Sequence, residues 1–196
     1  MIKLLISDLD DTLYDWTGFF VPAFYAMADE IARMTGIDEK KLLNEYMAAH
    51  QRLGSVEYPY ATLELPSIKA YYNNAPAEEL KAALRPAFNV FNSVRESHLH
   101  LLPGVEEMLR ALTEMGVTLI AYTESSKENG FYRLMKLGIE PYFKHVYTFE
   151  SQFKSAYAVS EKVRTVQTKK PDIAVIGRIC AGEGYDKSEV MYLGDN

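Results

Sequence analysis

The chain begins with an apolar segment that has the pattern of a buried β-strand. Residues 2–6 carry four apolar side chains and one lysine, and a polar group follows that includes Ser7, Asp8, Asp10, Asp11 and Thr12. A short apolar run with few charges is typical of a strand in a parallel sheet that is covered on both faces. Three more runs of this kind predict strands over residues 117–122, 146–148 and 190–193.

Apolar residues at helical spacing predict helices between these strands. Four helices are expected between the first and second strands, at 21–34, 39–53, 65–72 and 77–97. Asp38 has the position of an N-cap for the second of these helices, Gly54 has the position of its stop, and Pro86 is expected to bend the fourth. Three further helices are expected at 105–115, 127–137 and 171–181, and residues 149–167 are expected to form an extra helix or loop.

The order of these elements predicts an α/β fold with two domains. Alternating strands and helices are typical of a three-layer core, in which a parallel sheet lies between two layers of helices. Residues 15–100 contain only predicted helices, so we expect them to form an all-helical cap that is inserted into this core. The core would then be discontinuous and consist of residues 1–14 and 101–196.

The composition excludes several classes of function. Apolar residues make up 48% of the 196 residues and charged residues 24%, which is ordinary for a soluble domain. A net charge of −6 and a pI near 5.3, without a stripe of Lys and Arg, argue against a nucleic-acid partner. No apolar run reaches the roughly 20 residues that span a membrane, and no secretory signal is recognised. The single cysteine, Cys180, excludes an internal disulfide and agrees with a cytoplasmic protein.

The two acids after the first strand suggest a site for a cation. Side chains alternate along an extended chain, so Asp8 and Asp10 are expected to point the same way, at the edge of the sheet where ligands bind. Two carboxylates in this arrangement repel each other unless a hard cation such as Mg²⁺ lies between them. A carboxylate near such an ion can attack an electrophilic phosphorus. An EF-hand calcium loop is excluded, because its glycine would fall at Leu13 and its closing glutamate at Phe19.

Three other polar residues lie at or near strand ends. Thr123 follows the predicted strand 117–122, where its hydroxyl could face a bound anion. Lys170 precedes Pro171, which is typical of a helix start, and offers an ammonium group to a phosphate. Asp195 follows the last predicted strand and could supply another carboxylate to a metal ion.

In this order, these residues resemble the four motifs of the haloacid dehalogenase-like (HAD) hydrolase superfamily. Residues 8–13 are similar to its first motif, Thr123 to the second, residues 170–172 to the third and residues 193–195 to the fourth. Residues 102–105, Leu-Pro-Gly-Val, are typical of members that carry a helical cap after the first motif. The resemblance extends over essentially the whole chain and implies a Rossmann-like core.

The resemblance also implies a role for each candidate residue. Asp8 would be the nucleophile that forms an aspartyl-phosphate, and Asp10 would be the general acid and then the general base. Thr123, Glu124 and Lys170 would lie at the phosphoryl group and the substrate. The implied cofactor is Mg²⁺, and its ligands would be Asp8, the main-chain carbonyl of Asp10, and Asp195.

Asp10 bears on the type of reaction. Dehalogenases of this superfamily lack an acid at this position, because a halide leaves without a proton, whereas an alcohol needs one. The resemblance therefore implies a Mg²⁺-dependent phosphatase that acts on a small phosphorylated metabolite. Two alternatives stay open: a phosphomutase with the same motifs, and a non-catalytic regulatory or binding protein with an incomplete metal site. The sequence leaves open whether the protein is a monomer or a homodimer.

Two features depart from the pattern of the superfamily. The sequence stops one residue after Asp195, where relatives usually continue with another acid, a strand and a helix, so we expect it to be a fragment. Glu124 stands where many relatives have asparagine, and it would either disfavour an anionic part of the substrate or cap the next helix. Lys154 and Lys169 are alternatives for the role assigned to Lys170. The adjacent Pro171-Asp172 favours Lys170.

Overall fold

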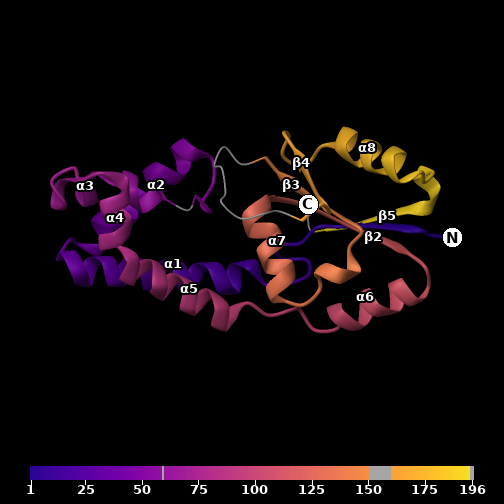
Figure 1. Cartoon of the computed structure of the whole chain (residues 1–196), viewed down its shortest axis with the longest axis horizontal. Helices are drawn as coiled ribbons and strands as arrows, with labels where there is room; N and C mark the ends of the chain where they lie inside the picture. The colour runs from indigo at the N-terminus through magenta and orange to yellow at the C-terminus, as the bar shows by residue number, and fades with distance from the viewer. Residues whose placement is uncertain (59, 151–159, 195–196) are drawn as a thin grey trace. The chain divides into compact units, whose positions relative to one another are not determined.

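The computed structural model describes residues 1–58, 60–150 and 160–194 (Figure 1). The chain divides into two compact units. A core unit consists of Met1–Trp16 and Leu99–Asn196, and a helical unit consists of Thr17–His98. No described helix is both long enough and apolar enough to cross a membrane.

The core unit contains a parallel five-stranded sheet with the order β4-β3-β2-β1-β5. Its strands are β1 (Leu4–Ser7), β2 (Thr118–Ser126), β3 (His145–Phe149), β4 (Val163–Val166) and β5 (Val190–Leu193). β1 lies between β2 and β5, with Leu4 opposite both Thr118 and Val190. Because the strands are parallel, the polar residues at the carboxyl ends of β1 and β2 come to the same edge of the sheet.

Helices cover both faces of this sheet (Figure 1). Helix α8 (Ile173–Glu183) packs Val175, Ile179 and Cys180 against Ile6 and Ile120, which point to one face. Helices α6 (Val105–Glu114) and α7 (Lys127–Lys136) lie on the other face and contact β2. The three-layer α/β/α core with a parallel sheet is therefore confirmed.

The helical unit contains no strand among its described residues. It comprises most of α1 (Trp16–Thr35), then α2 (Glu39–Leu53), the 3₁₀ helix η1 (Ala61–Glu64), α3 (Pro66–Tyr71), α4 (Ala77–Ala83) and α5 (Arg85–His98). Its interior is formed by apolar residues that include Ile31, Leu42, Leu65 and Ile68. The predicted bounds of α2 are confirmed, with the Asp38 side chain accepting a hydrogen bond from the Lys41 N–H and Gly54 in the left-handed region.

Several predicted elements differ in extent. The helix expected at 77–97 is two helices, because Pro86 lacks the N–H of a helix interior and instead occupies the second position of a new helix. α1 begins five residues before the expected start, at Trp16 rather than at Val21, and includes Pro22. β2 does not end at Tyr122 but continues through four polar residues to Ser126, with a shift in its register against β3.

The expectation of an extra helix or loop at 149–167 is wrong for the part that the structure describes. Residues 163–166 form the edge strand β4, which makes this a sheet of five strands and not four. Arg164 and Thr165 are exposed, so β4 lacks the apolar pattern that predicts a buried strand. Residues 151–159 lie outside the described residues.

Candidate active site

Asp8 lies at the carboxyl end of the central strand β1 and is 4% exposed. Its backbone N–H donates to the Leu193 carbonyl at the end of β5 (2.7 Å), and its Oδ1 accepts from the Leu9 N–H (2.7 Å). Burial raises the pKa of Asp8 above the usual carboxyl value, and the neighbouring Lys170 opposes this rise. Asp8 is thus a desolvated carboxylate. Among the described residues, a single cationic side chain contacts it.

Lys170 provides that cation. Its Nζ lies 2.6 Å from Asp8 Oδ2, and both side chains are almost completely buried. The ammonium also lies 5.0 Å from the ring centroid of Tyr122 and 5.9 Å from that of Tyr192, which are distances of cation–π contacts. Among the described residues, Nζ makes no directed hydrogen bond in addition to the ion pair. An anion that arrives beside Asp8 would therefore meet an ammonium whose described contacts are one carboxylate and two aromatic rings.

Asp10 is held by a separate set of donors. Oδ1 accepts from the Tyr14 hydroxyl (2.8 Å) and from Arg133 Nη1 (2.8 Å). Oδ2 accepts from the Thr123 hydroxyl (3.0 Å) and from the Ser125 hydroxyl (2.8 Å). Asp10 and Asp8 are close enough that the charge of Asp10 contributes to the raised pKa of Asp8. The structure therefore brings Asp8, Asp10, Thr123 and Lys170 together at one edge of the sheet.

Thr123 occupies a different position in the strand from the expected one. It lies within β2 instead of following it, and it is completely buried. Its hydroxyl donates to Asp10 and accepts from the Ser125 N–H (3.0 Å). In this arrangement Thr123 is bonded to a neighbouring acid, and an anion would have to compete for its single hydroxyl proton.

Three residues of this site, Tyr14, Ser125 and Arg133, are not among those predicted from the sequence. Ser125 could have been found from the alternation of side chains along a strand, if β2 had been extended past Thr123. Arg133 carries no such signal, because its place on the buried side of α7 depends on how closely that helix packs on β2. A charged residue on a buried helix face needs a partner of opposite charge.

A close approach of α7 to β2 makes these contacts possible. A Cβ added to Gly130 of α7 would lie 3.2 Å from Thr123 Cγ2 and 3.7 Å from Ser125 Cβ. A glycine is therefore needed for the helix to lie at this distance from the strand. One helical turn further, Arg133 then reaches Asp10 and Ser125.

Glu124 is exposed and holds the segment that carries Lys170. Its Oε1 accepts a hydrogen bond from the Lys170 backbone N–H (2.7 Å). Of the two alternatives to Lys170, the structure describes only Lys169, which does not contact Asp8 in the ion pair that Lys170 makes. Lys169 lies over the ring of Phe149, with 5.8 Å between Nζ and the ring centroid, and Lys154 lies outside the described residues.

Asp195, one of the predicted metal ligands, also lies outside the described residues. No cluster of three or more His, Cys, Asp or Glu side chains that could hold a metal occurs in residues 1–58, 60–150 and 160–194. Asp8 nevertheless fits a cation: it is buried, its pKa is raised by desolvation and by Asp10, and its N–H is bonded to Leu193, two residues before Asp195. A hard divalent ion would supply the positive charge that these oxygen donors favour.

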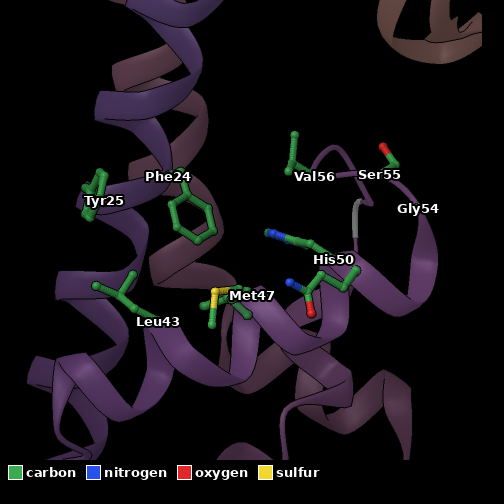
Figure 2. Close-up of a pocket in the computed structure, with 10 residues that line it drawn as sticks. Phe24, Tyr25, Leu43, Met47, His50, Gly54, Ser55 and Val56 are labelled. Carbon is green, nitrogen blue, oxygen red and sulfur yellow. The ribbon is translucent and has the colours of Figure 1, made fainter.

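The helical unit contains a separate hollow of about 560 Å³ between α1 and α2 (Figure 2). Figure 2 shows the His50 ring reaching from α2 toward Phe24 and Val56. The ring centroids of His50 and Phe24 are 5.7 Å apart, and burial lowers the pKa of His50. The other lining residues are Tyr25, Leu43, Tyr46, Met47, Gln51, Gly54 and Ser55.

Several known proteins are similar to this chain. Glyceraldehyde 3-phosphate phosphatase of Pyrococcus abyssi is 25% identical over 206 residues, which cover 100% of this chain and 74% of that protein. The enzyme of the same name from Methanopyrus kandleri is 27% identical over 199 residues, with 100% and 76% coverage. A crystal structure of 2-haloacid dehalogenase from Pseudomonas syringae pv. Tomato DC3000 is similar with a TM-score of 0.62 at 23% identity, and the match covers 98% of this chain and 77% of that one.

A family model provides the assignment that these low identities cannot give. The model described as "haloacid dehalogenase-like hydrolase" matches residues 2–196. This match covers almost the whole chain and includes every residue of the site described above. The chain therefore belongs to the haloacid dehalogenase-like hydrolase family.

Proposed function

We propose that this hydrolase is a phosphatase that removes the phosphoryl group of a small phosphorylated metabolite through an aspartyl-phosphate on Asp8. The observation that carries the proposal is the buried pair of Asp8 and Lys170, 2.6 Å apart, beside a second acid. Phosphoryl transfer depends mainly on positioning and on the neutralisation of charge. A buried carboxylate next to an ammonium supplies both.

Each residue has one role in the proposed reaction. A carboxylate oxygen of Asp8 attacks phosphorus, and the bond between phosphorus and the ester oxygen breaks. Asp10, in its protonated form, gives its proton to the leaving alcohol and becomes a carboxylate. In the second half, Asp10 takes a proton from a water molecule, which attacks the aspartyl-phosphate and releases inorganic phosphate. Lys170 and Thr123 bind the phosphoryl oxygens throughout, and Glu124 positions the Lys170 segment.

We further propose that Asp8, the main-chain carbonyl of Asp10, and Asp195 hold a Mg²⁺ ion. The ion would supply positive charge to the phosphoryl oxygens. The buried state of Asp8 and its bond to the end of β5 support this assignment.

The proposed substrate is a small phosphate ester. Two relatives over the whole chain are named glyceraldehyde 3-phosphate phosphatase, so triose phosphates belong in any first panel of substrates. Residues 15–100 would act as a cap that selects the substrate and excludes water, which is a common use of an inserted unit. We propose this role for the helical unit from its insertion directly after the first motif.

The test is a panel of phosphate esters, which includes p-nitrophenyl phosphate and glyceraldehyde 3-phosphate, with released phosphate as the readout. The wild-type chain should release phosphate in the presence of Mg²⁺, and Asp8→Asn should lower kcat by at least about 10³-fold, because an amide is not a nucleophile here. Asp11→Asn is the matched control, since Asp11 is exposed and its φ of 53° is one that asparagine adopts readily. Equal turnover by wild type and Asp8→Asn would refute the proposal, and so would isomerisation of the substrate without release of phosphate.

A further inference from the structure

Arg133 is a buried cation whose contacts lie at the candidate active site. The residue is 3% exposed and lies on α7. Its Nη1 is 2.8 Å from Asp10 Oδ1 and 2.9 Å from the Ser125 hydroxyl. A buried guanidinium is costly unless it is paired and hydrogen-bonded. Asp10 provides that pair, so the position of each group depends on the other.

The four donors on Asp10 use its full capacity. A carboxylate has about four acceptor sites, two on each oxygen. Tyr14 and Arg133 occupy those of Oδ1, and Thr123 and Ser125 occupy those of Oδ2. Asp10 can therefore bond to a substrate only if one of these donors moves away.

The two oxygens differ in how readily their donors can move. Thr123 and Ser125 are hydroxyls that can rotate, and each has a single proton to donate. Arg133 is a rigid planar group, and it is buried in the core unit. A phosphoryl group that accepts the hydrogen bond of Thr123 would therefore free a site on Oδ2, where Asp10 can carry the proton for the leaving group, while Oδ1 stays fixed by Arg133.

We propose that Arg133 is a positioning residue for Asp10: it fixes the carboxyl group through Oδ1, so that Oδ2 is presented to the reacting ester when Thr123 turns to the phosphoryl group. This inference rests on the proposed phosphatase function. Arg133 acts through the orientation of Asp10 and does not itself contact the substrate. Positioning of this kind has a large effect on the rate of reaction, because a small displacement of a catalytic group can lower that rate strongly.

The test is a double-mutant cycle on the full chain with Asp10→Asn, Arg133→Met and both together. Two substrates are used: p-nitrophenyl phosphate, whose leaving group needs little help from an acid, and an alkyl phosphate, whose leaving group needs much. Arg133→Met should lower kcat on the alkyl phosphate by about 10²-fold and on p-nitrophenyl phosphate by less than about tenfold, as expected for the loss of a general acid. The KM should change less than about threefold. Added to Asp10→Asn, Arg133→Met should change kcat by less than about threefold.

An equal loss on both substrates, or an equal factor in the wild-type and Asp10→Asn backgrounds, would overturn the inference and leave Arg133 as a structural residue. Arg133→Lys should restore part of the rate, because an ammonium can still pair with Oδ1. Arg110→Met is the control, since Arg110 is exposed on α6, and it should leave kcat unchanged.

Two further variants keep the test decisive if Arg133→Met does not fold. Tyr14→Phe removes the other donor of Oδ1 and should show the same dependence on the leaving group, at about one tenth of the size. Ser125→Ala removes a donor of Oδ2 and also an acceptor for Arg133 Nη1, so it should show a weaker dependence on the leaving group than Arg133→Met. The outcome is also separable from that of the proposed function. If the wild-type protein turned over none of the esters, both the proposed function and this inference would be contradicted. If the wild type were active and Asp8→Asn inactive, but the effects of Arg133→Met and Asp10→Asn on kcat were additive, this inference alone would be contradicted.

Discussion

The Lys170 backbone N–H donates a hydrogen bond to Glu124 Oε1 over 2.7 Å. Glu124 follows Thr123 in β2, so this bond ties the segment that carries the ammonium to the strand that carries the hydroxyl. We expect Glu124→Ala to lower kcat/KM for phosphate esters by about fivefold, since a single hydrogen bond contributes about 1 kcal/mol. Glu124→Gln keeps an acceptor at the same place and should stay within about twofold of wild type.

A loss of equal size in both Glu124 variants would show that the negative charge matters and that the bond does not. Steady-state kinetics on one substrate, with thermal unfolding as a check of folding, distinguishes the two outcomes. A gain in kcat/KM with Glu124→Gln would instead favour repulsion between this acid and an anionic substrate.

Lys170 should be needed for catalysis, and the adjacent lysine should not. Lys170→Met leaves the buried Asp8 without its cation and removes a donor to the phosphoryl group, so kcat/KM should fall by at least about 10²-fold. Lys169→Met is the matched control, because Lys169 lies over Phe149 and makes no ion pair with Asp8 among the described contacts. It should remain within about threefold of wild type. A larger loss in the Lys169 variant than in the Lys170 variant would reverse the assignment.

We expect a side chain at position 130 to lower the activity of the protein. In Gly130→Ala the new methyl group meets Thr123 at 3.2 Å, so α7 or the hydroxyl must shift by a few tenths of an ångström. We expect kcat to fall by about tenfold, because Thr123 and Arg133 are displaced together. The gain of about 0.5–1 kcal/mol from alanine in a helix should be offset by the overpacking, so the unfolding free energy should change little.

Gly177 of α8 offers the comparison for this variant. It has no atom within 4 Å of an added Cβ, so Gly177→Ala should raise the unfolding free energy by about 0.5–1 kcal/mol and leave kcat unchanged. Urea denaturation of both variants measures the difference. If Gly130→Ala were fully active and equally stabilised, the close approach of α7 to β2 would not matter for the site.

A second buried carboxylate should make stability depend on pH. Glu183 ends α8, and its side chain is 3% exposed. It pairs with Lys144 Nζ (2.7 Å) and with His145 Nδ1 (2.6 Å). Burial tends to raise the pKa of Glu183, but the hydrogen bonds and charges of these two partners outweigh it and hold the pKa below its usual 4.5.

A carboxyl whose pKa is lower in the folded than in the unfolded state stabilises the protein above the unfolded pKa, and this contribution is lost as the pH falls through the folded pKa. At pH 7, Glu183→Gln should therefore reduce the unfolding free energy by about 2 kcal/mol. The difference between wild type and variant should shrink as the pH falls below about 4 and vanish near the folded pKa. Glu78 forms an exposed ion pair with Lys81, so Glu78→Gln should cause no measurable change in the unfolding free energy at neutral or at acidic pH. A difference that grows on acidification would contradict the sign of the shift.

Much of the fold could be predicted from local patterns. The caps of α2 at Asp38 and Gly54 and the bounds of β5 agree with the structure, because they depend on short-range rules of capping and on apolar runs. The edge strand β4 could not be predicted, since exposed polar residues occupy two of its four positions. Strand β2 was predicted too short for a similar reason: Glu124 and Ser125 do not carry an apolar pattern.

The candidate site divides in the same way. The spacing of Asp8 and Asp10 indicated a pair of acids at a strand end, and the structure brings Lys170 and Thr123 to them. The partners of Asp10 depend on how closely α7 packs on β2, and that distance is set by Gly130. Tertiary packing of this kind leaves no regular spacing in the sequence from which Arg133 could be inferred.

The central position of β1 has a consequence for how the chain is made. This strand precedes the other described strands in the sequence, but it lies between β2, in the second half of the given chain, and β5, with Leu4 opposite Val190. Pairings between segments so distant in sequence form slowly, because a long loop must close, at a cost in conformational entropy, before the strand contacts can stabilise the chain. The apolar β1 therefore emerges from the ribosome long before its partners, and we expect the nascent protein to need shielding by a chaperone during that interval.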